Sequence, residues 1–268
     1  MTVTALINRF FIQTGERMVT AIQELGYIAT LLVESIYWSV LGHRKKQSVR
    51  LSSIFSEAMQ IGVNAAPIIV VLCFAVGVML AIQAIETLKT FGAESKVIIG
   101  VALSVTREFS PLIVGVLVAG RSGSSITARI GSMKLAQEID ALSVIGINPV
   151  RYLLAPILLA MIVMVPTLTM LGNLAGIFGG AIFSIPSLDM SLGVYIQRTI
   201  SVLSVDDIYQ GLIKSVVFAV IIALIGASNG FRVRGGAVAV GRATTRSVVL
   251  SISCIVLADM VFTYFLNR

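Results

Sequence analysis

The sequence predicts an all-α integral membrane protein, in which an amphipathic N-terminal helix lies in the membrane interface and five transmembrane helices follow it. Three observations support this fold class. Of the 268 residues, 57% are hydrophobic and 12% are charged, whereas soluble domains have about 25% charged residues. Apolar stretches long enough to cross a bilayer recur along the chain. Basic residues gather in alternate connections between these stretches. A soluble fold could not hide this much apolar surface.

The N-terminal segment, about residues 1–60, has the pattern of an amphipathic helix. Polar residues recur at steps of three or four, opposite apolar ones. The polar positions are Arg9, Gln13, Glu16, Thr20 and Glu24, and the apolar ones are Leu6, Phe10, Val19 and Ile22. This pattern is typical of an interfacial helix, and a helix packed on the rest of the protein is the alternative. Trp38, followed by the basic run 43–46, indicates an aromatic anchor beside anionic headgroups. No cleavable signal is expected, because Arg9 comes after several apolar residues.

The second segment, residues 61–268, is predicted to hold the five spans. Each apolar stretch is near or above the roughly 20 residues that cross the hydrocarbon core. The stretches cover residues 61–86, 97–119, 152–184, 208–228 and 247–266. Pro156 and Pro166 are expected to kink the third. Small residues repeat every four positions at Gly115, Ala119 and Gly123, and again at Gly172, Gly176 and Gly180. Such ridges mark close helix contacts, within a subunit or across a dimer.

The orientation follows from the basic residues. Three segments are rich in them: the one before the first span, the second–third connection and the fourth–fifth connection. Their basic residues are Arg44, Lys45, Lys46, Arg50, Arg121, Arg129, Lys134, Arg151, Arg232, Arg234, Arg242 and Arg246. With five spans, all three segments fall on one side. The positive-inside rule then predicts a cytoplasmic N-terminus and an external C-terminus.

The chain carries no recognisable catalytic or cofactor-binding motif. The G-x-x-x-x-G-K-[ST] phosphate loop is absent, and the run Gly120–Gly123 is too short to replace it. We therefore expect no cofactor in this chain, and any ATP hydrolysis must come from another one. No metal site or catalytic residue is expected, because His43 is the only histidine and stands in a basic cluster. Cys73 and Cys254 are interpreted as small hydrophobic residues. The net charge of +7 is attributed to basic loops and not to nucleic-acid binding.

Two charges inside the membrane are the most unusual feature. Arg107 and Glu108 interrupt the second span near its middle. A lone charge at the bilayer centre costs about 2.5–3.5 kcal/mol on insertion scales, so each needs a partner or a wet cavity. Adjacent residues point about 100° apart on a helix and do not pair well with each other. Two interpretations stay open: a substrate-facing polar site, or ion pairs between helices, with Lys214 or Asp259 as partners.

A second candidate substrate surface lies on the first span. Leu80, Gln83, Thr87 and Phe91 fall along one helical stripe toward the external end. A mostly apolar stripe with two polar groups suits the wall of a cavity for an amphiphile. Ordinary helix packing is the alternative, and residue types alone favour it.

The second–third connection predicts a short cytoplasmic helix over 133–148, ended near Gly146 and Pro149. An exposed helix between two spans suits docking on a soluble partner, and a packed loop is the alternative.

Several motifs together resemble the MlaE/YrbE-type permeases of MCE-associated ABC transporters. They run in family order over about the last two-thirds of the chain. The matching pieces are Arg107–Pro111, AGRSGSSITARIGSMK at 119–134, EIDALSVIGINP at 138–149, IKSVVFA at 213–219 and GGAVAVGRATTRSVV at 235–249. The chain departs from the family at Ser110, often Gly, at Arg129, commonly acidic, and at Gln137-Glu138, often Glu-Gln.

The resemblance implies a function and a set of partners. The chain would be the permease of a transporter in the bacterial inner membrane that moves phospholipids between the inner and outer membranes. Two copies of the chain would form a homodimer. The homodimer would bind three further proteins: a cytoplasmic ATPase that binds ATP and magnesium, an external MCE-domain lipid-binding protein and a small STAS-domain protein. Arg107 and Glu108 match the polar pair near the family's lipid cavity. The 133–148 helix matches its coupling helix, which seats in the ATPase. The implied coupling residues are Met133, Lys134, Glu138, Asp140, Leu142 and Ile145.

Two other classes compete with this interpretation. A secondary transporter or channel would use the intramembrane charges for ion coupling, and its activity would not need an ATPase. An intramembrane enzyme would need a nucleophile and base that the sequence does not display.

Overall fold

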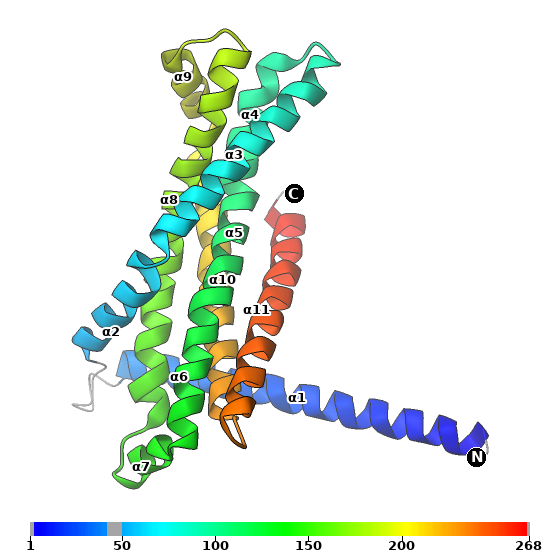
Figure 1. The fold of residues 1–268 in the computed structure, drawn as a ribbon, viewed down its shortest axis with the longest axis vertical. Coiled ribbons are helices and arrows are strands. Elements are labelled where there is room, and N and C mark those ends of the chain that lie inside the picture. Colours follow the sequence, from blue (N-terminus) through cyan, green and yellow to red (C-terminus); the bar gives the residue numbers. More distant parts are fainter. Residues whose placement is uncertain (1–2, 42–49, 267–268) are drawn as a thin grey trace.

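The computed structural model describes residues 3–41 and 50–266, and every element in these ranges is a helix (Figure 1). Six helical segments of the described ranges are long and apolar enough to cross a membrane. They are Met18–Ser39, Leu51–Lys89, Glu94–Leu135, Val150–Ser187, Val205–Phe231 and Ala237–Leu266. The last five run side by side as a bundle, whereas the first crosses one end of the bundle at a steep angle (Figure 1). This arrangement is that of an all-α integral membrane protein.

The bundle helices are continuous but change their winding along the way. The first consists of α2 (Leu51–Ala58), η1 (Met59–Val63) and α3 (Ala66–Lys89). The second consists of η2 (Glu94–Lys96), α4 (Val97–Ser104), η3 (Val105–Phe109), α5 (Ser110–Val118), η4 (Ala119–Gly123) and α6 (Ser124–Leu135). After the short α7 (Glu138–Val144) come η5 (Val150–Leu154), α8 (Ala155–Ser187), α9 (Leu192–Val202), α10 (Val205–Phe231) and α11 (Ala237–Leu266). The helix that crosses the bundle is α1 (Val3–Leu41).

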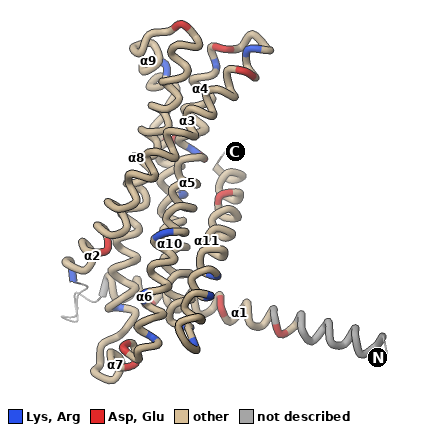
Figure 2. Tube along the Cα trace, in the orientation of Figure 1, with Lys and Arg blue, Asp and Glu red and all other residues tan. Residues whose placement is uncertain are grey.

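The two ends of the bundle are named here the α7 end and the α9 end, after the short helices found there (Figure 1). Among the described residues, the basic second–third and fourth–fifth connections both lie at the α7 end (Figure 2), whereas Arg44, Lys45 and Lys46 lie outside the described ranges. Every predicted span lies inside a bundle helix, but the helices extend beyond the predicted limits. The second runs to Leu135 and not 119, so Arg121, Arg129 and Lys134 lie on the helix itself. Hydropathy detects the hydrocarbon core, and a helix continues past that core wherever other helices support it.

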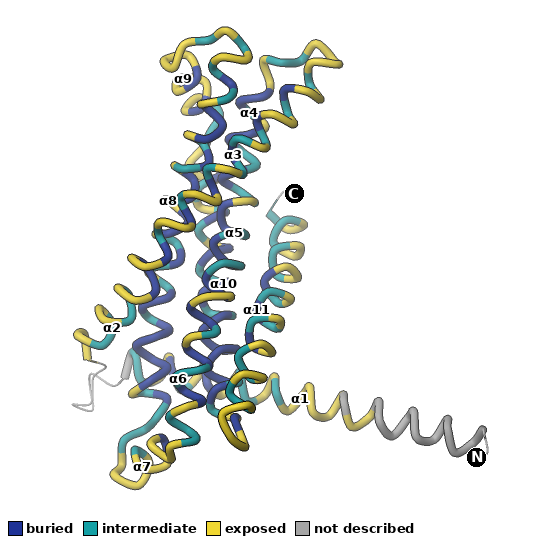
Figure 3. The backbone as a smooth tube through the Cα atoms, viewed as in Figure 1, coloured by how far each residue is buried: buried dark blue, intermediate teal, exposed yellow. Residues whose placement is uncertain are grey.

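The core lies where α8 and α10 pass through the middle of the bundle, and these two are the most buried spans (Figure 3). Leu154, Ile157, Met161, Phe218 and Ile222 are fully buried there. By contrast, α11 exposes most of its surface, including Val256, Leu257, Met260 and Phe265. At the α9 end, α9 is fastened to α8 by Tyr195, whose hydroxyl donates to the carbonyl of Ile177 over 3.0 Å. Burial raises the pKa of Tyr195 to about 12, so the hydroxyl stays a neutral donor.

Both small-residue ridges pack within the subunit. Gly115 faces Phe218 of α10, and Gly123 faces Ile222 of the same helix. Gly172 faces the side chain of Cys73 on α3, and Gly176 faces the backbone carbonyl of that residue. This settles the question that the sequence left open. Glycine lets these helix backbones come close, because a side chain would have no room.

The contact between α3 and α8 predicts a large effect of a single methyl group. A Cβ on Gly77 would lie 1.9 Å from the carbonyl oxygen of Gly176, which is backbone and cannot rotate away. We expect Gly77→Ala to lower the free energy of unfolding by about 3 kcal/mol through overpacking. Thermal unfolding in detergent measures it. Gly100→Ala is the control, because its Cβ would meet nothing within 4 Å. Equal melting temperatures for the two variants would contradict the close approach.

Prolines account for two of the π-helical turns, η3 and η5, which are wider than α-helical turns. Pro111 follows η3 and Pro156 follows η5, each two residues after the turn ends. A proline has no N–H for the carbonyl four residues earlier and its ring clashes with that carbonyl, so the preceding turn widens. In η3 the affected carbonyl is that of Arg107. The motif Arg107–Pro111 thus places both intramembrane charges on a widened turn. Of the two kinks predicted in α8, Pro166 lies inside the helix and Pro156 in its first turn.

α1 is attached to the α7 end by one polar face. Glu24 pairs with Arg232 and Arg246, Glu34 accepts from Asn148 Nδ2 over 2.5 Å, and the Trp38 ring lies 5.3 Å from the guanidinium of Arg151. Trp38 therefore contacts a basic side chain of the bundle, and the basic run 43–46 lies outside the described residues. The opposite face is an exposed apolar stripe. It comprises Met18, Ile22, Leu25, Val33 and Ile36. One face of α1 is thus packed on the rest of the protein, which was the alternative interpretation. The other face keeps the exposed apolar surface that an interfacial helix needs.

Candidate functional site

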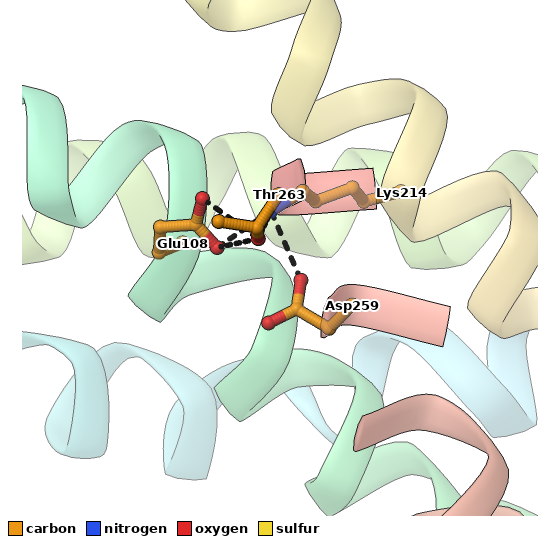
Figure 4. Close-up of polar contacts among 4 residues, drawn as sticks. All are labelled: Glu108, Lys214, Asp259 and Thr263. Atoms are coloured by element: carbon orange, nitrogen blue, oxygen red, sulfur yellow. Dashed lines mark hydrogen bonds and ion pairs between the residues drawn. The ribbon is translucent and has the colours of Figure 1, made fainter. Parts of the chain in front are cut away.

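A polar cluster joins three bundle helices within otherwise apolar spans (Figure 4). Lys214 of α10 donates to Glu108 Oε2 of η3 over 2.5 Å and to Thr263 Oγ1 of α11 over 3.0 Å. It also forms an ion pair with Asp259 Oδ1 of α11 at 3.0 Å. Thr263 Oγ1 lies 3.1 Å from Glu108 Oε2. The four residues, Glu108, Lys214, Asp259 and Thr263, are called the lysine cluster below.

Lys214 is the centre of this cluster and is almost sealed. Its side chain is 1% exposed, against 16% for Asp259 and 31% for Glu108. An ammonium removed from water is costly unless it is paired and hydrogen-bonded. Two carboxylates and a hydroxyl supply those contacts here, so the cation is well compensated. Glu108 keeps the exposed edge, which makes it the member that an outside group can reach.

Arg107 makes a second connection from the same widened turn to the start of α10. Its guanidinium pairs with Asp207, and its Nε donates to Asp207 Oδ1 over 2.6 Å. Asp207 also caps α10, because its Oδ2 accepts from the backbone N–H of Ser204 over 2.8 Å. The Asp207 side chain is 2% exposed, whereas that of Arg107 is 33% exposed. The capping carboxylate thus holds one edge of the Arg107 guanidinium, while about one third of the arginine side chain stays accessible.

Both intramembrane charges therefore take part in ion pairs between helices, which was one of the two interpretations. Glu108 pairs with Lys214, a partner that the sequence suggested, and Arg107 pairs with Asp207, which it did not. Each keeps about one third of its side chain exposed. The ion pairs therefore leave the other interpretation, a substrate-facing site, available as a proposal.

Two members of these networks escaped sequence reasoning, Asp207 and Thr263. A signal for both existed. Asp207 and Lys214 are two helical turns apart, and Asp259 and Thr263 are one turn apart, so each pair shares a helix face. Polar residues at such spacing within an apolar span indicate a buried polar face.

The four residues of the predicted stripe on the first span differ in their exposure. Leu80 packs against the cluster of Ala81, Val101 and Val105, whereas Gln83 and Thr87 are exposed on α3 and Phe91 is 78% exposed beyond its end. The inner edge thus follows the packing interpretation, and the outer part is free to face lipid or a partner. Its role in binding substrate remains a prediction.

The segment predicted as one helix over 133–148 is broken in two. α6 ends at Leu135 and α7 begins at Glu138, because Gln137 adopts a left-handed conformation with φ of 60°. An ion pair of 2.7 Å between Lys134 and Asp140 spans the break. A helix pattern in sequence does not show such a local reversal. The result is a short helix that protrudes from the α7 end (Figure 1).

The predicted coupling residues are distributed over this helix pair in distinct ways. Met133 packs against the core, and Leu142 is half-buried. Glu138 and Asp140 are exposed, and Ile145 is 69% exposed beside Val144, which is 86% exposed. Exposed large apolar side chains at a protruding tip are typical of a contact surface. Val144 was not among the predicted coupling residues.

Arg129, one of the positions at which the sequence departs from the pattern that it resembles, has a local partner. It pairs with Glu57 of α2 at 2.8 Å, so it connects the first and second bundle helices within this chain. This contact explains how the basic residue is accommodated.

Comparisons with known proteins agree on one family. The family model described as permease MlaE matches residues 54–265. A probable ABC transporter permease protein of Rickettsia typhi is 35% identical over 223 residues, covering 83% of this chain and 86% of the relative. One of Synechocystis is 32% identical over 224 residues, with 84% and 85% covered. The chloroplastic protein TRIGALACTOSYLDIACYLGLYCEROL 1 of Arabidopsis thaliana is 34% identical over 190 residues, with 71% and 54% covered.

Proposed function

The chain belongs to the MlaE permease family and is a multi-pass membrane permease subunit, and from this premise we propose that it moves phospholipids in an ABC transporter energised by a separate ATPase. The observation that carries the proposal is the lysine cluster. A charged network within apolar spans, with Glu108 partly exposed at its edge, can meet a lipid headgroup beside walls that suit acyl chains.

The proposed headgroup site combines the two charges on η3. Arg107 offers a guanidinium that can donate to a phosphate, and Glu108 offers a carboxylate for hydroxyl or ammonium groups. Gln83 and Thr87 on the exposed part of α3 would extend the site, with Leu80 and Phe91 as apolar wall. A homodimer would close this surface into a cavity between two subunits.

The proposed energy input is at the α7 end. The ATPase would bind ATP and magnesium and would hold α7, with Ile145 and its neighbours in a groove. Nucleotide binding would then shift the population of permease conformations, with no covalent chemistry in this chain. An MCE-domain lipid-binding protein would receive or deliver lipid at the other end, and a small STAS-domain protein would accompany the ATPase. We place the complex in a bacterial inner membrane, where it exchanges phospholipid with the outer membrane.

Reconstituted transport tests the headgroup site. We expect Glu108→Gln and Arg107→Gln each to reduce ATP-driven phospholipid movement at least about tenfold, because each removes a charge-assisted contact of 1.5–3 kcal/mol. A fluorescent phospholipid in vesicles that contain the ATPase measures the rate. Asp206→Asn and Arg198→Gln are controls, since both residues are exposed and outside the cluster. Full rates in both test variants, with normal assembly, would show that the site assignment is wrong.

The same cluster also suits a secondary transporter or channel, because buried titratable groups can couple to ions. Transport without the ATPase, but dependent on pH or membrane potential, would favour that function over the one proposed.

A further inference from the structure

Three adjoining hollows lie at the α7 end, where α1 meets the turn between α10 and α11. The first, of about 680 Å³, and the second, of about 340 Å³, share Arg232, Val233 and Arg234. The third, of about 700 Å³, runs along α11 and shares Arg242 and Arg246 with the second. The first two are called the basic pocket below, and the third the apolar groove.

The basic pocket has more positive charge than its own carboxylate can neutralise. Glu24 pairs with Arg232 at 3.1 Å and with Arg246 at 2.7 Å. Arg234 and Arg242 form no ion pair with any described residue, and both are exposed. Lys134 reaches the first hollow but is paired with Asp140. Four arginines thus line the basic pocket, and only two of them pair with Glu24, which leaves the positive charge of Arg234 and Arg242 for a further anion.

The apolar groove adjoins the basic pocket at Arg242 and Arg246. Val238, Val249 and Leu250 line it, together with Gly241, Arg242, Thr245 and Arg246. Val238 is 72% exposed and Val249 is 58% exposed. A hydrocarbon chain laid here would cover apolar surface and gain about 25 cal/mol per Å² removed from water.

We propose that this surface binds an anionic phospholipid, with its phosphate between Arg234, Arg242 and Arg246 and an acyl chain along the apolar groove. Arginine recognises phosphate through two parallel N–H donors. Basic pockets between membrane helices are typical sites for anionic headgroups. A soluble anion would leave the groove unused, and an acidic protein partner would not need it. The combination of charge and adjoining apolar wall therefore favours lipid.

This lipid is distinct from the transported one. Arg246 and Thr263 both lie on α11, and the rise per residue separates them by about 25 Å. The lipid would instead reinforce the place where Glu24 connects α1 to the bundle. Its binding does not depend on the lysine cluster, so the two proposals can fail separately.

Native mass spectrometry of the purified full-length protein in mixed detergent micelles tests the site. We expect phosphatidylglycerol to bind in preference to zwitterionic phosphatidylcholine. Arg234→Gln/Arg242→Gln should weaken phosphatidylglycerol binding about 30-fold, because each basic residue near a membrane surface contributes roughly 1 kcal/mol. The variant should fold normally, since neither arginine forms an ion pair with a described residue. Lys96→Gln/Arg198→Gln, which removes two positive charges at the α9 end, should leave binding unchanged.

Further arms separate the sources of the anion. Glycerol phosphate and inorganic phosphate should not displace the lipid at matched concentration, and Val249→Gln should weaken lipid binding but not that of the free anions. Equal phosphatidylglycerol binding by the arginine variant and the wild type would overturn the proposal. So would displacement by inorganic phosphate, or loss of the bound lipid whenever the ATPase is present, which would assign the arginines to a protein contact.

Discussion

Replacement of Lys214 by Met is expected to stop phospholipid transport and to lower the free energy of unfolding by about 3 kcal/mol. The methionine leaves Glu108 and Asp259 facing each other without the cation that both contact. Removing one partner of a buried ion pair costs about 3–5 kcal/mol, and the lower end applies because Glu108 is partly exposed. Thermal unfolding in detergent and reconstituted transport measure the two effects.

A triple variant separates the structural role of the charges from their role in transport. Lys214→Met with Glu108→Gln and Asp259→Asn removes the network as a whole, so no buried charge is left without a partner. Its stability should return close to that of the wild type, whereas transport should stay absent. If the triple variant moves lipid at the normal rate, the lysine cluster is a packing element and has no part in substrate handling.

An acidic residue at the tip of α7 is expected to separate the permease from its ATPase. Ile145→Asp and Val144→Asp alter side chains that are 69% and 86% exposed, so the melting temperature should not change. In a groove of the ATPase, a carboxylate without a partner would cost about 2 kcal/mol or more, which weakens binding roughly 30-fold. Co-purification of the ATPase and lipid transport should fall together.

Ile200→Asp provides the matched control for the α7 variants. Ile200 lies on α9 and is 70% exposed, so the change in charge and exposure is the same but occurs at the other end of the bundle. It should leave the amount of bound ATPase unchanged. Retention of the ATPase by both α7 variants would place the coupling surface elsewhere, and loss in the control as well would indicate a general defect.

The sequence by itself determined the class of the molecule and the place of its five bundle helices. A span is recognised from about twenty consecutive residues, because the cost of burying each group in lipid depends mainly on the group itself. The same local information located Arg107 and Glu108 as charges that need partners. It also identified the small residues that allow close packing, at Gly172 and Gly176.

Only the tertiary structure decided which partners these residues have. Glu108 and Lys214 are 106 positions apart, and Arg107 and Asp207 are 100 positions apart. The packing of the second bundle helix against α10 brings both pairs together, and helical periodicity predicts the face of a residue but not the helix opposite it. The break at Gln137 and the meeting of α1 with Arg232 and Arg246 are of the same kind. Hydrophobicity is a property of each segment, whereas an ion pair is a property of two segments that the fold has placed in contact.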